Sequence, residues 1–267
     1  MKTKSDEQVR GAVRARYAGI AQGVTDDCGC SPGSCCSPDA SISLNPSVRL
    51  GYSETELLTV PEGANLGLGC GNPQAIAALR RGEVVLDLGS GAGFDCFLAA
   101  RQVGPAGQVI GVDMTPEMIA KARANAAQAA YGNVEFHLGV IEHLPVPDSS
   151  IDVIISNCVI NLSTDKPSVF REAMRVLRPG GRLAVSDVVA TAELPADIRE
   201  DLLLYSACAG GAATVGELQR MLGDAGFEEI QIVPMDSSRE FIRDWAPGRR
   251  LEDYIVSASI LARKANA

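Results

Sequence analysis

From residue 82 onward, short β-branched and apolar runs alternate with segments in which apolar residues recur every three or four positions. Such alternation is typical of βαβ units that build a mainly parallel sheet. The apolar runs predict seven strands, over residues 84–88, 108–113, 134–138, 151–156, 182–189, 229–234 and 254–262. The pattern therefore predicts one α/β domain of the doubly wound, Rossmann-like type.

The segments between these strands predict helices over residues 116–130, 166–176 and 215–225, another directly after Gly93, and a helical excursion over 193–213. No convincing helical period separates the last two strands, so we expect them to form an antiparallel pair at the edge of the seven-stranded sheet. We interpret residues 178–182, Arg-Pro-Gly-Gly-Arg, as a turn that leads into the fifth strand.

The N-terminal region differs in composition from the rest of the chain. Over residues 6–22, Val9, Val13, Tyr17 and Ile20 share one face of a predicted helix, which we expect to cap the domain. Residues 23–46 are rich in Cys, Gly, Ser and Pro, which predicts a loop without regular structure. We therefore expect an N-terminal helix and Cys-rich loop over residues 1–46, followed by the main domain over 47–267.

Composition and charge narrow the function classes. The 267 residues carry a formal net charge of −9, with Lys and Arg scattered, so nucleic acid is not an expected partner. No secretory signal or membrane-crossing stretch is seen, and we expect a cytoplasmic protein without a membrane partner. In a reducing compartment, eight cysteines indicate metal or metalloid binding, redox cycling or nucleophilic chemistry rather than structural disulfides.

A glycine-rich turn follows the first predicted strand. The chain runs Gly89-Ser90-Gly91-Ala92-Gly93 into a helix, and Asp113 ends the second strand 24 residues after Gly89. Glycine lets the backbone approach a ligand closely, and a carboxylate at that position can accept hydrogen bonds from both hydroxyls of a ribose. Phe94 stands where the dinucleotide fingerprint requires Gly or Ala, which disfavours a nicotinamide cofactor.

The segment VLDLGSGAGFD (85–95), together with GVDM (111–114), resembles the first two motifs of class I S-adenosylmethionine-dependent methyltransferases. The resemblance implies S-adenosylmethionine as the cofactor. It implies contacts around the amino-acid end from Gly89, Gly91 and Gly93, on ribose from Asp113, on adenine from Met114, Ile141 and Glu142, and near the sulfonium from Asn157. Asp87 and Ser90 are further candidates for cofactor binding.

Three further phrases are similar to those of arsenite methyltransferases: NLGLGCGNP around Cys70, SNCVINLSTDK around Cys158 and YSACAGGA around Cys208. The resemblance implies that these three thiolates bind trivalent arsenic within a methyltransferase domain over residues 47–267. Cys158 also follows the fourth predicted strand, and open α/β sheets bind ligands outside such strand ends. Trivalent arsenic is soft, prefers thiolates and keeps a lone pair that can attack a methyl group without a general base.

Four other cysteines, Cys28, Cys30, Cys35 and Cys36, lie in the N-terminal loop in a CxC…CC arrangement that lacks the CxxC spacing of common zinc sites. The resemblance implies that one N-terminal cysteine cooperates in catalysis, and Cys35 or Cys36 is the candidate. It also implies a thiol co-substrate, glutathione or thioredoxin. We expect arsenite or its thiol conjugates as substrate and no tightly bound metal cofactor.

The resulting hypothesis is an arsenite methyltransferase that produces methylated arsenicals for detoxification. Two alternatives stay open: a class I methyltransferase for an organic small molecule, and a non-catalytic metalloid-binding protein. Cys96 lies in the first turn of a predicted helix with the apolar Phe94 and Phe97 nearby, so we favour a structural role for it; a reactive thiol at this helix N-terminus is the alternative. His137 and His143 form no metal-ligand spacing and are interpreted as ordinary polar residues.

Overall fold

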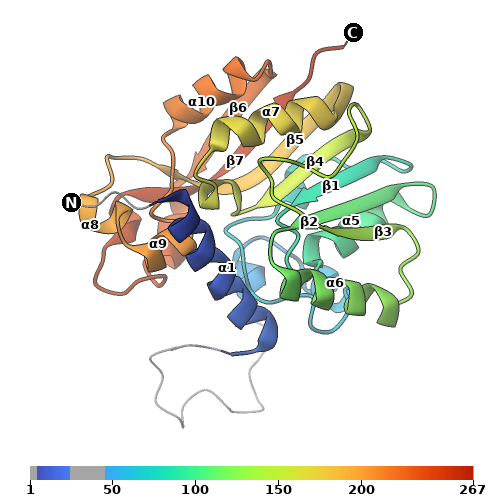
Figure 1. Cartoon of the computed structure of the whole chain (residues 1–267), viewed down its shortest axis with the longest axis horizontal. Helices are drawn as coiled ribbons and strands as arrows, with labels where there is room; N and C mark the ends of the chain where they lie inside the picture. Colours follow the sequence, from blue (N-terminus) through green and yellow to red (C-terminus); the bar gives the residue numbers. More distant parts are fainter. Residues whose placement is uncertain (1–4, 25–45, 267) are drawn as a thin grey trace.

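The fold is a seven-stranded sheet with helices on both faces, seen in a computed structural model that describes residues 5–24 and 46–266 (Figure 1). The strand order is β3-β2-β1-β4-β5-β7-β6. The strands are β1 (Val84–Leu88), β2 (Gln108–Asp113), β3 (Val134–Leu138), β4 (Ile151–Asn157), β5 (Leu177–Ala190), β6 (Glu228–Met235) and β7 (Ile255–Arg263).

The helices fill the connections between these strands. The α-helices are α1 (Asp6–Gln22), α2 (Pro46–Arg49), α3 (Glu54–Thr59), α4 (Pro73–Ala77), α5 (Phe94–Val103), α6 (Pro116–Gln128), α7 (Lys166–Val176), α8 (Ala196–Arg199), α9 (Leu202–Ser206), α10 (Val215–Asp224) and α11 (Arg239–Ile242). Short 3₁₀ turns are η2 (Ile160–Leu162), η3 (Asp236–Ser238) and η4 (Leu251–Asp253). Within the described residues, no helix has both the length and the apolarity that a membrane crossing demands.

Strand pairing confirms the predicted mixed sheet. β1 pairs in parallel with β2 and β4, and β4 pairs in parallel with β5. β7 runs antiparallel to both β5 and β6, so it is the reversed strand of the edge pair. The carboxyl ends of β1, β2 and β4 consequently meet at one edge of the sheet, where ligands bind in folds of this type.

The fifth strand differs from the sequence prediction. β5 begins at Leu177, so the interpretation of residues 178–182 as a turn before the strand is wrong. Ile151 of β4 pairs with Leu177 of β5, but Val153 pairs with Arg182, so the register between the two strands shifts at this point. Gly180 has φ 76° and donates to the carbonyls of Lys264 and Ala265, so the glycine pair forms a bulge that the C-terminal segment holds.

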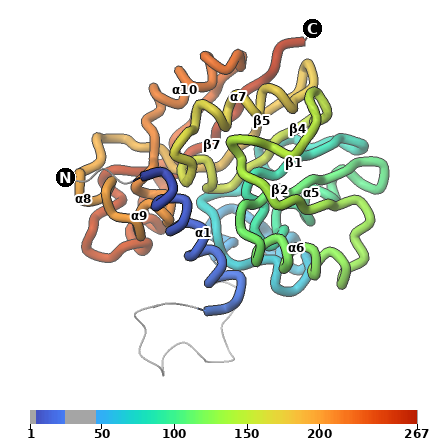
Figure 2. Tube along the Cα trace, viewed as in Figure 1, coloured from blue at the N-terminus to red at the C-terminus, as the bar shows by residue number. Residues whose placement is uncertain are grey.

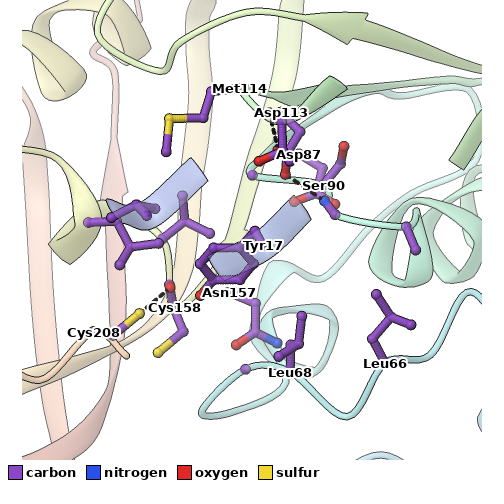
Figure 3. A pocket seen from close by; sticks show the side chains of 18 of the residues that line it. Tyr17, Leu66, Leu68, Asp87, Ser90, Asp113, Met114, Asn157, Cys158 and Cys208 are labelled. Atoms are coloured by element: carbon purple, nitrogen blue, oxygen red, sulfur yellow. Dashed lines mark hydrogen bonds between the residues drawn. The ribbon is translucent and has the colours of Figure 1, made fainter. Parts of the chain in front are cut away.

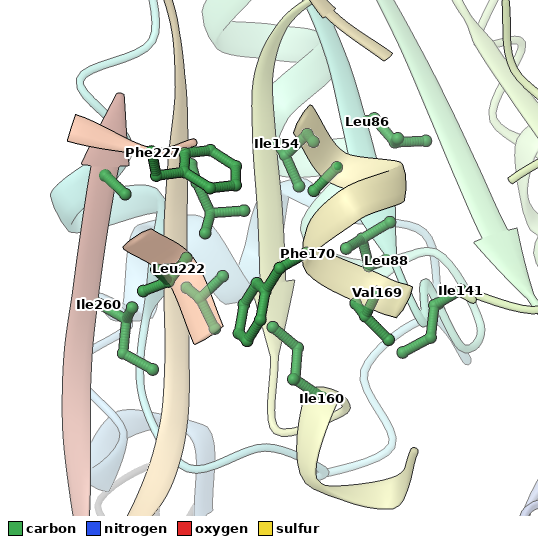
Figure 4. Packing of buried hydrophobic residues seen from close by; sticks show 14 of the residues in the cluster. Leu86, Leu88, Ile141, Ile154, Ile160, Val169, Phe170, Leu222, Phe227 and Ile260 are labelled. Carbon is green, nitrogen blue, oxygen red and sulfur yellow. The ribbon is translucent and has the colours of Figure 1, made fainter. Parts of the chain in front are cut away.

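Both faces of the sheet are buried under helices. α4, α5 and α6 pack on one face, whereas α7 and α10 cover the other. Figure 4 shows Phe170 of α7 and Leu222 of α10 among sheet residues such as Ile154. Each such side chain contributes roughly 1.5–3 kcal/mol when fully buried. This double coverage explains why the central strands are continuous apolar runs in the sequence instead of alternating patterns.

Helix α1 packs over the main domain instead of extending from it. The Cα trace in Figure 2 shows α1 between α9 and α6, and both helices contact it. Ser5 caps its first turn, while Val9 and Val13 are buried. The helix thus places its inner face over the carboxyl edge of the sheet, and the helical excursion over 193–213 supplies α8 and α9 beside it.

Candidate active site

The turn between β1 and α5 is built from glycines with positive φ. Gly89, Gly91 and Gly93 have φ values of 72°, 51° and 94°. A Cβ on Gly89 would lie 2.4 Å from the side chain of Val159, whereas the nearest atom to one on Gly91 is 4.0 Å away. Gly89 is therefore required for packing, while Gly91 leaves open space where a ligand can approach the backbone.

Asp113 connects this turn to the end of β2. Its Oδ2 accepts a hydrogen bond from the Gly91 N–H at 2.9 Å, and its Oδ1 accepts one from the Thr115 N–H at 2.8 Å. Burial raises the pKa of Asp113, and the hydrogen bonds from Thr115 and Gly91 oppose that effect. Each oxygen retains acceptor capacity, so the carboxylate can still bind a pair of hydroxyls.

A cavity of about 300 Å³ begins at this turn and extends to two cysteines. Figure 3 shows Asp113 and Ser90 at one end and Cys158 and Cys208 at the other. The side chain of Ser90 has a buried Oγ without a hydrogen-bond partner among the described residues. The residues expected from the sequence that line the cavity are Asp87, Gly89, Ser90, Gly91, Asp113, Met114, Ile141, Glu142, Asn157, Cys158 and Cys208.

A hydrogen-bonded group of Tyr52, Asp95 and Asn157 lies between the two ends. The Tyr52 hydroxyl donates to Asp95 Oδ1 at 2.7 Å, and Asn157 Nδ2 donates to Tyr52 Oη at 3.0 Å. Burial raises the pKa of Asp95 to about 6, against the lowering effect of the hydrogen bonds from Tyr52 and Asn157. Asp95 lines the cavity and offers a carboxylate to a cationic ligand, a role that sequence reasoning missed.

Cys158 and Cys208 stand on strained backbone at the far end of the cavity. Their φ values are 60° and 66°, in the left-handed region that non-glycine residues rarely adopt. The Cys158 N–H donates to the Ser186 carbonyl at 2.8 Å, which fixes it beyond the end of β4. The Cys208 thiol donates to the Cys158 carbonyl at 2.6 Å. Such conformations persist only where the surrounding structure holds them, and they cluster at functional sites.

Cys70 adjoins this pair without lining the cavity. Its N–H donates to Asn157 Oδ1 at 3.0 Å, and its carbonyl accepts from Ser257 Oγ at 2.6 Å. The sulfurs of Cys70 and Cys158 and a carboxylate oxygen of Asp187 all lie within 4.8 Å of one another. Cys158 interacts with both other thiols, so it is the central member of the three.

The three thiols are stable in their protonated form. Burial raises the pKa of Cys70. The hydrogen bond with Cys208 lowers the pKa of Cys158, but the hydrogen bond with Cys70 and burial outweigh it, so the pKa is raised overall. The hydrogen bond with Cys158 and burial raise the pKa of Cys208. The three side chains are therefore buried neutral thiols and not exposed thiolates.

Helix α1 closes one side of the cavity. Tyr17 lines it and hydrogen-bonds to Cys208, which lowers the thiol pKa in part. Arg10 donates to Glu142 Oε1 at 3.4 Å, and the same oxygen accepts from Ser163 Oγ at 2.7 Å. The sequence predicted that α1 caps the domain, but the helical spacing of its apolar residues did not indicate that Tyr17 would contact a cysteine.

Two of the residues singled out from the sequence, Gly93 and Cys96, lie away from the cavity wall. Gly93 packs beneath Phe97 and is not part of the cavity wall. The Cys96 thiol is buried and donates to Asp87 Oδ2 at 3.2 Å, in keeping with the structural role expected of it. Cys35 and Cys36 lie outside the described residues.

Comparison with known proteins places the chain in a family. The methyltransferase domain family matches residues 79–226. An arsenite methyltransferase from Halobacterium salinarum is 55% identical over 267 aligned residues, which cover 98% of this chain and 68% of that protein. The chain belongs to the arsenite methyltransferase family. Within this family, an enzyme from Aquipseudomonas alcaligenes is 46% identical over 65% of this chain and 51% of its own length.

A solved structure agrees with that membership. An arsenic(III) S-adenosylmethionine methyltransferase from Chlamydomonas reinhardtii superposes with a TM-score of 0.60 at 34% identity, covering 84% of this chain and 74% of the algal chain. This chain thus spans about two thirds of the length of the Halobacterium salinarum relative and about half of that of the Aquipseudomonas alcaligenes one.

Proposed function

We propose that this chain transfers the methyl group of S-adenosylmethionine to trivalent arsenic bound by Cys70, Cys158 and Cys208. One observation carries the proposal: Cys158 and Cys208 line the same cavity as Asp113 and the glycine turn, and Cys70 adjoins them. A methyl donor and a thiol-bound acceptor can therefore meet within one cavity. The names of the relatives point to the same reaction.

The residues at the glycine end fit the proposed cofactor. Gly91 leaves room beside the backbone, and Asp113 has acceptor capacity for ribose hydroxyls. Met114 and Ile141 offer apolar contact for the adenine ring, and Asp95 offers a carboxylate for the ammonium group. When bound there, S-adenosylmethionine supplies a methyl group activated by the positive charge on its sulfur. We assign Asp87, Gly89, Ser90, Glu142 and Asn157 to the same binding site, with Gly93 as its support.

The raised pKa values of the three thiols suit arsenite loading. Arsenous acid condenses with three thiols to give a neutral trithiolate and three water molecules, so no proton has to leave the site for bulk solvent. A buried neutral complex avoids the cost of an uncompensated charge. Three As–S bonds also orient the arsenic lone pair away from the sulfurs and towards open space.

Methyl transfer then needs little from the protein beyond placement. The arsenic lone pair forms the bond to the methyl carbon while the carbon–sulfur bond breaks, and the departing sulfur keeps the bonding electrons. No proton moves, so no general base is required. Holding the reacting atoms near attack distance can supply about 7–11 kcal/mol of the barrier reduction.

The transfer raises arsenic from the trivalent to the pentavalent state, so a two-electron reductant must restore it before another cycle. We propose glutathione or thioredoxin for this role, with Cys35 or Cys36 as the internal thiol that exchanges with the site. These reductants and reduced cysteines are consistent with a cytoplasmic location. We assign no metal cofactor to the reaction.

Chromatography with arsenic-specific mass detection tests the proposal. Purified protein is incubated with arsenite, S-adenosylmethionine and a thiol reductant, and a Cys96→Ser variant serves as a matched control for a buried thiol outside the site. We expect methylated arsenic that depends on both protein and cofactor. Arsenite binding without product would instead indicate a metalloid-binding protein, and absence of both would redirect the search to an organic substrate.

A further inference from the structure

The thiol cluster contains one donor that arsenite chemistry does not use. Cys70 Sγ, Cys158 Sγ and a carboxylate oxygen of Asp187 are mutually within 4.8 Å, and all three residues are buried. We propose that this cluster also binds a divalent cation of the zinc class, which takes mixed sulfur and oxygen ligands. Trivalent arsenic selects soft sulfur, whereas zinc binds thiolate and carboxylate together.

The spacing of the three donors is close to what zinc requires. Zn–S bonds of about 2.3 Å and Zn–O bonds of about 2.0–2.2 Å place neighbouring tetrahedral ligands roughly 3.5–3.8 Å apart. Rotation of the two cysteine side chains between rotamers can shorten the distances between the donor atoms by about 1 Å, from at most 4.8 Å to the zinc-bound spacing. Cys158 borders the cavity, so an ion can reach the cluster from there. The fourth ligand is then either a water molecule in the cavity or the thiol of Cys208, which also lines it.

The carboxylate of Asp187 is already oriented for this task. Its Oδ1 accepts from Asn161 Nδ2 at 2.9 Å and from the Val188 N–H at 2.8 Å. Among the residues that the structure describes, its Oδ2 accepts one longer hydrogen bond, 3.3 Å from the Asn161 N–H, and so retains a lone pair for a cation. Hydrogen bonds that fix a ligand in this way are typical of zinc sites.

Charge balance also favours a cation at this position. Zinc binding breaks two S–H bonds and releases two protons, so two thiolates and one carboxylate surround the doubly charged ion with a net charge of −1. The ammonium of the half-buried Lys166 interacts electrostatically with Asp187 and offsets that charge. Arsenous acid, by contrast, condenses to a neutral trithiolate with release of three water molecules and does not use Asp187.

The two ligands therefore share Cys70 and Cys158 but differ at Asp187. A bound cation blocks the thiols that arsenic needs, which makes zinc a competitive inhibitor with respect to arsenite. That inhibition rests on the proposed function, whereas zinc binding itself does not.

A zinc titration against a chromophoric chelator tests the site directly. It uses the full chain with Cys28, Cys30, Cys35 and Cys36 replaced by serine, because those thiols could bind zinc on their own. We expect Asp187→Asn to weaken zinc binding about 10- to 100-fold, while arsenite retained after gel filtration changes by less than about threefold. Cys158→Ser should bind neither zinc nor arsenite, whereas Cys96→Ser should bind both.

Unchanged zinc affinity in Asp187→Asn, or no zinc binding in the four-serine parent, would overturn the proposal. Should Asp187→Asn fail to fold, Co²⁺ replaces zinc in the parent protein: thiolate-to-cobalt charge-transfer absorption must appear there and vanish in both Cys70→Ser and Cys158→Ser. Persistence of that absorption in either variant contradicts the site. Zinc binding by the four-serine parent together with no methylated arsenic from the unsubstituted chain would refute only the proposed function, and methylation by the unsubstituted chain without zinc binding by the parent would refute only this inference.

Discussion

The thiol of Cys208 donates a hydrogen bond of 2.6 Å to the main-chain oxygen of Cys158, although 50 residues separate the two positions. The contact joins the end of α9 to the end of β4, and both cysteines have positive φ. A left-handed conformation costs a non-glycine residue roughly 1–2 kcal/mol. The fold thus accepts strain at two positions, and the result is a pair of adjacent thiols at the cavity wall.

Replacement of Cys208 by serine should reduce methylation while leaving the stability of the fold nearly unchanged. A serine hydroxyl can still donate to the Cys158 carbonyl, so thermal stability should change little, but an oxygen is a poor ligand for soft arsenic. We expect methylation to fall about 100-fold or more, which corresponds to ~2.7 kcal/mol of transition-state stabilisation. Product formation by Cys208→Ser at the rate of Cys96→Ser would contradict the three-thiol site.

Removal of the Asp113 carboxylate should weaken binding of the cofactor and leave arsenite binding unchanged. Hydrogen bonds to a charged acceptor contribute about 1.5–3 kcal/mol each, so Asp113→Ala should raise the dissociation constant for S-adenosylhomocysteine at least tenfold. Isothermal titration calorimetry measures this change, and arsenite retention on the same variant should stay normal. Glu193→Ala, which removes an exposed carboxylate, is the matched control; an equal loss there would point to a general charge effect.

Nearly the whole sheet, and the residues that line one end of the cavity, could be predicted from the sequence because both depend on local patterns. A strand, a glycine turn and an acidic strand end lie within one short segment, 85–113, whose spacing carries the information. The network of Tyr52, Asp95 and Asn157 could not be predicted, since Asn157 and Tyr52 are 105 positions apart. The same holds for Asp187, which is one polar residue within an apolar strand until the fold places it beside Cys70.

The glycine turn offers a paired test of packing. A Cβ at Gly89 would lie 2.4 Å from Val159, and φ there is 72°, so Gly89→Ala should destabilise the protein by about 1–3 kcal/mol and weaken cofactor binding. Gly216 in α10 has open space within 4 Å of the position that a Cβ would take, and Gly216→Ala should be neutral or stabilising by up to about 1 kcal/mol. Urea denaturation of the two variants compares them; equal effects would show that the turn is not tightly packed.

Stability should depend on pH through the carboxyl group of Asp187. Burial raises its pKa to about 6, against hydrogen bonds from Val188 and Asn161 and the charge of Lys166, whereas its ordinary value is 3.8. Between these values the folded protein keeps a proton that the unfolded chain releases, so the contribution of this group to stability falls as pH rises from about 4 to 6. Below that pH range the carboxyl group does not lower the free energy of unfolding. Above the range, its ionisation in the buried site lowers the free energy of unfolding by about 3 kcal/mol.

Asp187→Asn removes this titration, so the free energy of unfolding of the variant minus that of the parent should increase between pH 4.5 and pH 7. Urea denaturation at the two pH values measures the difference. Asp165→Asn is a control whose difference from the parent should stay nearly constant between the same two pH values, because hydrogen bonds from Ser168 lower the pKa of Asp165 from its ordinary value of 3.8 and its contribution is lost only below that value. A difference for Asp187→Asn that does not vary with pH would show that the buried carboxyl group ionises normally, in which case the thiol cluster already holds a full negative charge beside Cys70 and Cys158 at acidic pH.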